Sequence, residues 1–266
     1  MEPKPIKETI QQSLTQVKTL ETYDHIVLTE EETTEALRLA RKAKATKLHT
    51  QQYWNKVNSD PVYPTYSAEA FQTMILERAN LQKPGFLNDQ WTSPILWALS
   101  LYFTGDKRFE ALGEGYSLEK GVALFGGIGC GKTMLMELFE ENQKESFIVK
   151  PTQEIAEEYQ DEGTIAKYFH LQKSTIRSNV FGQKEWGLCF DDLGTEDIKK
   201  NYGNQLNAMS TILMRRYDAR LFSATHLTFN LTADELEQMY GTRVRSRMRE
   251  MFNVVAFHKD APDRRG

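Results

Sequence analysis

The stretch GGIGCGKT, residues 126–133, determines how the rest of this sequence is interpreted. It fits the pattern G-x-x-x-x-G-K-[ST], in which glycines let backbone N–H groups curl around phosphates. The apolar run KGVALFGG (120–127) precedes it, and TMLMELFEENQ, which favours a helix, follows it. A glycine-rich turn can match the pattern by chance, but a strand before it and a helix after it favour a phosphate-binding loop. The expected contacts are Gly126, Gly127, Ile128, Gly129, Cys130, Gly131, Lys132, Thr133 and Met134.

Such a loop predicts ATP and Mg²⁺ as ligands, and the sequence offers side chains for both. Lys132 is expected to reach the β- and γ-phosphates, and Thr133 is expected to bind Mg²⁺. The segment WGLCFDDLGTE (186–196) supplies acids at the end of an apolar run. Asp191 is the expected second metal ligand, acting through water. Two acids at a strand end also occur as simple turn formers, so the assignment rests on the phosphate loop nearby.

Two further side chains are candidates for positioning water and sensing phosphate. Asp192 is expected to polarise the attacking water, although many P-loop ATPases carry the longer Glu at this place, so Glu196 could share the role. Asn230 follows the run LFSATHLTFN (221–230) and could orient the same water. The alternative for Asn230 is a helix cap for LTADELEQMYG, a common role for Asn.

The order of apolar runs and helices predicts an α/β fold in two parts. Residues 1–110 are expected to form a helical region, and residues 111–266 are expected to form a parallel sheet covered by helices. The predicted strands are five short apolar runs at 120–127, 146–151, 186–192, 221–230 and 253–258.

Four arginines alternate in YGTRVRSRMRE, residues 240–250, within a chain whose formal net charge is -4. At about 100° per residue, Arg243 and Arg247 fall on one helix face and Arg245 and Arg249 on another. The apolar positions between them are Val244, Met248, Met251 and Phe252. Arginines beside a core helix are usually solvated, but an arginine delivered to a γ-phosphate stabilises the transition state.

The composition excludes several classes of protein. No run approaches the roughly 18 apolar residues of a membrane span, and the N-terminus lacks the apolar core of a secretory signal. The two cysteines, Cys130 and Cys189, are far apart and belong to no CxxC pair, which argues against a zinc site or a disulfide framework. We therefore expect a cytoplasmic protein without a membrane partner.

Taken together, the motifs resemble those of the AAA+ ATPases, and within them the DnaC-type helicase loaders and the transposition ATPase IstB. The resemblance covers roughly residues 115–266 and includes the phosphate loop, the acids of DDLG and Asn230 before a leucine and a short helix. The family segment G-x-R-V-x-x-R-hydrophobic-R matches GTRVRSRMR, which implies an arginine finger at Arg247. The family's C-terminal arginine falls in DAPDRRG, at Arg264 or Arg265, with Arg264 preferred on spacing. The helical lid of the family is expected to be minimal here.

The resemblance implies an ATPase that assembles into a spiral or ring of identical subunits on binding ATP. It further implies that residues 1–110 bind a replicative helicase of the DnaB type and that the ATPase core engages single-stranded DNA. The segment TEDIKKNYGNQ (195–205) is the candidate DNA contact, through Lys199, Lys200 and Tyr202, although it could equally be a solvated loop. An IstB-like regulator that binds duplex DNA and recruits a transposase is the alternative, and a small-molecule kinase is a third.

Overall fold

The computed structural model describes two compact units, Met1–Pro61 and Val62–Gly266. The residues described are 26–57, 63–82, 86, 88–159, 161–173, 180–196, 200–201, 204–205 and 207–265. Within the first unit, the described part is one helix, α2 (Glu30–Val57), with four residues before it. None of the helices in the described part of the chain is long and apolar enough to cross a membrane.

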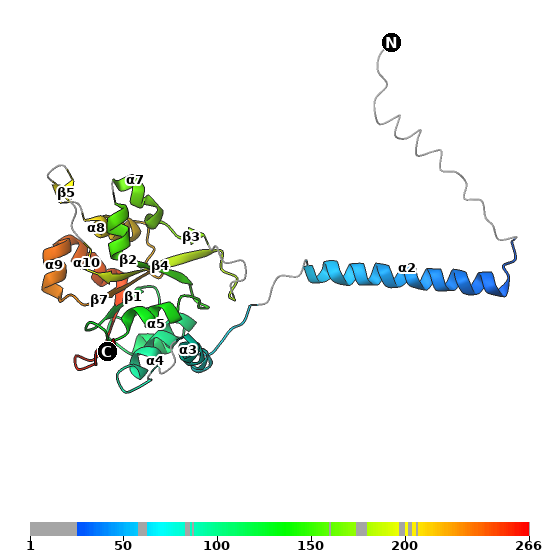
Figure 1. Cartoon of the computed structure of the whole chain (residues 1–266), viewed down its shortest axis with the longest axis horizontal. Helices are drawn as coiled ribbons and strands as arrows, with labels where there is room; N and C mark the ends of the chain where they lie inside the picture. Colours follow the sequence, from blue (N-terminus) through cyan, green and yellow to red (C-terminus); the bar gives the residue numbers. More distant parts are fainter. Residues whose placement is uncertain are drawn as a thin grey trace, which may run out of the picture. The chain divides into compact units, whose positions relative to one another are not determined.

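A mixed sheet with a parallel core forms the centre of the second unit (Figure 1). Its strands follow the order β2-β4-β7-β1-β8, and all neighbours in that order are parallel. A short antiparallel strand, β3 (Gln172–Lys173), pairs with β4. The five parallel strands fall on the five apolar runs predicted from the sequence: β1 (Gly121–Phe125), β2 (Phe147–Pro151), β4 (Glu185–Leu193), β7 (Thr225–Phe229) and β8 (Phe252–Ala256).

Helices cover both faces of this sheet, and the central strands β1, β4 and β7 are accordingly buried on both sides along most of their length. One face carries α3 (Ala68–Gln82), α4 (Ser93–Thr104) and α5 (Lys132–Leu138), and a 3-10 helix (Lys107–Ala111) follows α4. The other face carries α6 (Thr152–Glu158), α7 (Glu162–Ile165), a 3-10 helix (Ala166–Phe169), α8 (Ala208–Asp218), α9 (Ala233–Tyr240) and α10 (Thr242–Met251). The predicted α/β class, with a parallel sheet flanked by helices, is thereby confirmed.

The division into units differs from the predicted boundary after residue 110. Helices α3 and α4 belong to the same hydrophobic core as α5 and β1, and eight of the twelve residues of α4 are buried. A helix that is apolar nearly all round cannot remain on its own in water, so it packs into the larger unit. The part of the chain that forms a unit of its own before the α/β fold therefore ends near Pro61.

Two segments lie outside the main sheet and its helices: the residues after β8 and the candidate DNA segment 195–205. After β8, the described residues up to Arg265 form no helix. In the candidate DNA segment, β5 (Lys200–Asn201) and β6 (Asn204–Gln205) form a small antiparallel pair. Lys199 and Tyr202 lie outside the described residues, and the side chain of Lys200 is likewise not described.

A fully buried arginine fixes the amino-terminal end of β7. Arg216 of α8 has no exposed surface, and its guanidinium donates hydrogen bonds to Thr225 Oγ1 (2.7 Å) and to the carbonyls of Ala224 (2.7 Å), Tyr168 (3.0 Å) and His170 (3.0 Å). Burial lowers the pKa of Arg216 to about 10, so the group stays charged at neutral pH. Taken from the sequence alone, Arg215 and Arg216 in LMRRYD are expected at the protein surface or at a subunit boundary, and for Arg216 this expectation is wrong.

The Arg216→Ala substitution should lower the free energy of unfolding by about 3 kcal/mol or more, because it leaves a cavity and several buried acceptors without donors. Arg216→Lys should also destabilise, because one ammonium cannot donate in all of these directions. The control is Arg215→Ala, whose exposed ion pair with Glu162 should be worth less than about 1 kcal/mol. Urea denaturation of the three variants measures the difference. Equal stability of the Arg215 and Arg216 variants would contradict the structural role.

Candidate nucleotide and metal site

The phosphate loop connects β1 to α5 in the backbone conformation that its glycines permit. Gly129 and Gly131 have φ angles of 77° and 103°, in the region that side chains disfavour. A Cβ at Gly129 would also lie 1.7 Å from Asp263 Oδ1, so the C-terminal segment packs directly on the loop. The loop therefore requires glycine at this position both for its own curvature and for the segment that crosses it.

Lys132 lies at the start of α5 with only 6% of its surface exposed. Its ammonium donates hydrogen bonds to the carbonyls of Gly126 and Gly127, each at 3.0 Å. An ammonium has three donors, so the loop carbonyls hold it in place and leave one donor for another acceptor. This places a buried positive charge within the curve of the loop, as binding of an anion there requires.

Thr133 and Asp191 come together at the predicted metal position. Thr133 Oγ1 donates to both carboxylate oxygens of Asp191, at 3.0 Å each, and Thr228 Oγ1 donates to Asp191 Oδ1 at 2.5 Å. Burial raises the pKa of Asp191, as does the neighbouring Asp192, whereas the two threonines and Lys132 oppose the shift. The sequence analysis predicted Thr133 and Asp191 but missed Thr228. The only feature of the sequence that could have indicated Thr228 is a hydroxyl side chain within an apolar run.

The donor set fits Mg²⁺ bound together with a phosphate rather than a metal held by protein alone. Among the residues that the structure describes, no group of three or more His, Cys, Asp or Glu side chains could hold a metal ion. Mg²⁺ keeps several waters and binds through one or two carboxylates plus substrate phosphates. One hydroxyl and one carboxylate beside the loop, from Thr133 and Asp191, suit that mode of binding.

Asp192 is held by its backbone in an unusual conformation. Its φ angle is 53°, and the register between β4 and β7 shifts between Phe190 and Leu193. Its N–H donates to Thr228 Oγ1 (2.8 Å), and its carbonyl accepts from Thr152 Oγ1 (3.0 Å). Irregularities of this kind next to a site redirect a side chain. The carboxylate has no hydrogen-bond partner within the described residues, which leaves it available to water.

Glu196 does not share that role. It is 5% exposed, accepts a hydrogen bond from the N–H of Gly194 (2.7 Å) and accepts another from the hydroxyl of Tyr240. Burial and the adjacent Glu196 carboxylate raise the pKa of Tyr240. Both oxygens of Glu196 are thus engaged in joining α9 to the end of β4.

Asn230 is not the cap of the helix that follows it. Thr232 caps α9, and its hydroxyl and backbone exchange hydrogen bonds with Glu235 in a capping box. Asn230 is half-buried directly after β7, between the ends of β1 and β4 in the strand order. The helix-cap alternative is therefore wrong, and the amide of Asn230 has no hydrogen-bond partner within the described part of the chain.

Arg247 contacts α8 within its own chain. Its Nη1 lies 3.0 Å from Met214 Sδ and 3.4 Å from Asp218 Oδ1, and its guanidinium lies 4.4 Å from the centre of the Tyr217 ring. The predicted apolar positions of the helix, Val244, Met248, Met251 and Phe252, are all buried. The structure records no contact between Arg247 and the phosphate loop among the described residues.

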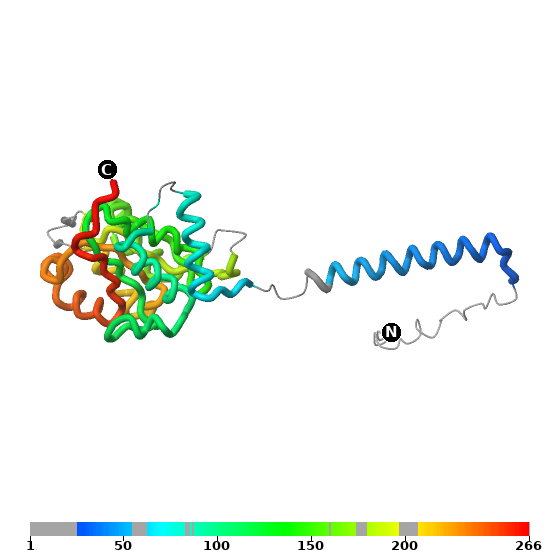
Figure 2. The backbone as a smooth tube through the Cα atoms, turned by 90° about the horizontal axis from the view of Figure 1, so that it is seen from below, coloured from blue at the N-terminus to red at the C-terminus, as the bar shows by residue number. Residues whose placement is uncertain are grey.

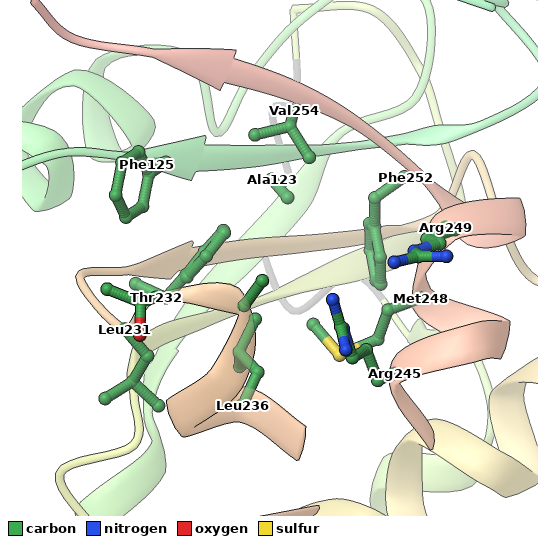
Figure 3. Close-up of a pocket in the computed structure, with 12 residues that line it drawn as sticks. Ala123, Phe125, Leu231, Thr232, Leu236, Arg245, Met248, Arg249, Phe252 and Val254 are labelled. Atoms are coloured by element: carbon green, nitrogen blue, oxygen red, sulfur yellow. The ribbon is translucent and has the colours of Figure 1, made fainter. Parts of the chain in front are cut away.

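The second arginine face borders an apolar pocket of about 290 Å³ (Figure 3). Arg245 and Arg249 lie on one side of it, and Arg245 forms an ion pair with Glu237. Its other lining residues in the described chain are Ala123, Phe125, Phe229, Leu231, Thr232, Ala233, Leu236, Met248, Phe252 and Val254. None of these lining residues belongs to the phosphate loop. Arg245 and Arg249 therefore border the apolar pocket and not the phosphate loop of their own chain.

Arg264 contacts the phosphate loop through its backbone. Its N–H donates to the carbonyl of Gly129 (3.0 Å), whereas its guanidinium donates to Asp89 Oδ2 (2.7 Å) and Thr92 Oγ1 (3.0 Å). The sequence missed Asp89 and Thr92, which precede α4. The C-terminal segment is thus tied both to the loop and to the turn before α4.

The fold and the site define an α/β protein with a parallel sheet and a phosphate-binding type of loop between β1 and α5. No family model and no curated protein sequence matches this chain. Eight chains of solved structures match it. One is AMPPCP-bound DnaA from Aquifex aeolicus, with 17% sequence identity and a TM-score of 0.40, over 75% of this chain and 52% of that chain. This chain spans about half of that DnaA chain, and so distant a likeness carries no argument about function.

The raised pKa of Asp191 gives a test of the metal site, because Mg²⁺ binds the deprotonated carboxylate. Affinity for Mg²⁺ in the presence of ATP should fall as pH falls toward that pKa. Thr228→Val removes a hydrogen bond that lowers the pKa, so it should weaken Mg²⁺ binding by roughly tenfold and move the loss to higher pH. Thr228→Ser keeps the hydroxyl and should bind normally. Calorimetric titration across about pH 5 to 8 measures this. If Thr228→Val and Thr228→Ser had the same dependence of Mg²⁺ affinity on pH, the assignment of Asp191 as a metal ligand supported by Thr228 would be contradicted.

Proposed function

We propose that this protein is an AAA+ ATPase of the DnaC type that loads a hexameric replicative helicase onto single-stranded DNA. The observation that carries the ATPase part is the cluster of Thr133, Asp191 and Thr228 beside a phosphate loop whose lysine is buried. A buried ammonium, a hydroxyl and a carboxylate next to a glycine-rich loop are the groups with which P-loop proteins bind ATP and Mg²⁺, and they support the proposal. The helicase and DNA parts rest on the sequence resemblance.

In this proposal the protein contributes position and charge rather than covalent chemistry. Lys132 and the loop N–H groups bind the phosphates, and Thr133 and Asp191 hold Mg²⁺. The carboxylate of Asp192 and the amide of Asn230 orient the attacking water. Mg²⁺ would supply charge neutralisation of the β- and γ-phosphates when bound.

The arginine finger is proposed to act between subunits. Arg247 is half-buried on the surface formed by α8 and α10, and it has contacts there rather than at its own phosphate loop. An arginine needed for hydrolysis must then come from a second copy. This arrangement makes hydrolysis depend on assembly, as a loader that works as a spiral or ring requires. Arg264 remains a proposed nucleotide contact through its link to Gly129.

The proposed helicase contact lies within residues 1–61. The sequence assigned residues 1–110 to this contact, but α3 and α4 form part of the ATPase core. Native mass analysis of the protein with its host's replicative helicase, with and without ATP and single-stranded DNA, tests the proposal. A defined complex that is lost when residues 1–61 are removed supports it. Filaments on duplex DNA without a helicase complex would favour the IstB-like alternative and overturn it.

Lys132→Ala should weaken ATP binding by roughly 10- to 100-fold, because it removes a charged, partly desolvated hydrogen-bond donor to the phosphates. Lys150→Ala, a change of the same kind at the end of β2, should bind ATP normally, because Lys150 forms only a loose pair with Glu154. Fluorescence titration with a labelled ATP analogue measures both. Equal affinity in the two variants would contradict the phosphate-binding role.

Arg247→Ala should bind ATP but lose about 10³-fold or more in hydrolysis. Asp192→Asn should also be inactive, because it lacks the carboxylate that polarises water. Mixing the two inactive variants should restore part of the activity, since one interface then combines an intact Asp192 with an intact Arg247. Arg243→Ala, an exposed change on the same helix, is the control. Normal hydrolysis by Arg247→Ala, or no recovery on mixing, would exclude a finger acting between subunits.

A further inference from the structure

Helix α2 separates its charges along its length. Its first six residues contain the acids Glu30, Glu31, Glu32 and Glu35, and the Thr29 hydroxyl accepts a hydrogen bond from the N–H of Glu32. From residue 36 to residue 57 there is no acidic residue at all. The same stretch contains six basic residues, Arg38, Arg41, Lys42, Lys44, Lys47 and Lys56, although the whole chain has a formal net charge of -4.

Among the basic residues of α2 whose side chains are described, all but Arg38 lack an ion pair within the described chain. Arg38 pairs with Glu35 at 2.6 Å, and both side chains are more than half exposed. A helix surface that is merely solvated usually alternates the two signs and gains i,i+4 pairs. Repulsion among like charges instead makes this helix less stable alone, which a partner with negative charge would relieve.

The helix presents an ordered basic face. Figure 2 shows α2 as one uninterrupted helix. At about 100° per residue, Arg41, Lys42, His49 and Tyr53 fall within roughly 60° of Arg38. The described side chains of α2 are all exposed, including Tyr53 and Trp54, whose ring centres lie 5.5 Å apart. The face therefore combines cations with an aromatic ring at its end.

The opposite side of α2 argues against a membrane surface as the partner. It is formed by Ala36, Ala40, Ala43 and Trp54, with Lys47 among them. Helices that lie in a membrane interface bury large apolar side chains such as Leu, Phe and Trp. Three alanines and a single tryptophan beside a lysine supply little of that area. Cations with a nearby aromatic ring are instead the combination that binds a phosphate backbone and stacks on a base.

We propose that α2 binds the phosphate backbone of nucleic acid through Arg38, Arg41 and Lys42 on the face that carries Tyr53, and through Lys44 and Lys47 on the other side of the helix, around which a single strand can pass. From Arg38 to Lys47 the helix rises about 14 Å, the length of roughly four phosphates of one strand. The choice of single-stranded DNA as the form bound rests on the proposed function as a helicase loader. The binding of a phosphate backbone by α2 does not. It places a DNA contact outside the ATPase unit.

The test uses the full-length protein and a fluorescent 30-nucleotide oligo-dT, with a duplex of the same length as a second probe. The variant replaces Arg41, Lys42, Lys44 and Lys47 with Gln, which preserves helix propensity. Its affinity in about 0.1 M salt should fall tenfold or more, and the slope of log K against log salt should decrease by roughly three. The control replaces four exposed cations of the second unit with Gln: Lys107, Lys173, Lys184 and Lys259.

Loss of binding in the α2 variant alone supports the proposal, and the two probes decide whether single-stranded or duplex DNA is the form bound. Equal losses in both variants, no change in either, or no DNA binding by the unaltered protein would overturn it. Binding of the unaltered protein to anionic phosphatidylglycerol vesicles with no DNA binding would also overturn it. ATPase activity without DNA is measured in parallel. If it is absent while α2-dependent DNA binding persists, the proposed function fails and this inference stands.

Discussion

A buried carboxylate must be hydrogen-bonded, and Asp191 meets this requirement by linking three elements of the fold. Thr133 reaches it from the start of α5, Thr228 from β7, and Asp191 itself ends the regular part of β4. Thr228 also accepts a hydrogen bond from the N–H of Asp192, so one threonine fixes both acids. The position of the phosphate loop relative to the two acids therefore depends on this small network.

The network explains how the charged side chains of Lys132 and Asp191 can be buried at the carboxyl ends of the strands. Lys132 and Asp191 are both almost fully buried, at 6% exposure each. Loop carbonyls satisfy the ammonium, and hydroxyls satisfy the carboxylate. Arg216 follows the same rule at the other end of β7, where carbonyl groups and Thr225 surround its guanidinium. Hydrogen-bonded buried charges thus lie at both ends of the central strands, while packing of buried side chains holds the middle of the sheet.

Functional residues could be predicted from the sequence where they are neighbours in the chain. The glycines, Lys132 and Thr133 are consecutive, and Asp191 follows an apolar run, so the loop and the acids were predictable. The roles of Glu196 and Arg216 were not, because each depends on partners distant in sequence: Tyr240 for the first, and Tyr168 and His170 for the second. The cap at Thr232 was within reach, because a Thr with a Glu three positions later is a known capping signal.

By itself the sequence determined the class of fold, the five parallel strands, the phosphate loop and the basic stretch of α2. These are properties of short segments, because periodicity, glycine content and charge act locally. Only the tertiary structure decided that α3 and α4 belong to the core of the α/β unit, that Thr228 contacts Asp191 and that Arg264 is tied to Asp89. Burial and hydrogen-bond partners decide such matters, and both arise only when segments far apart in the chain are packed together.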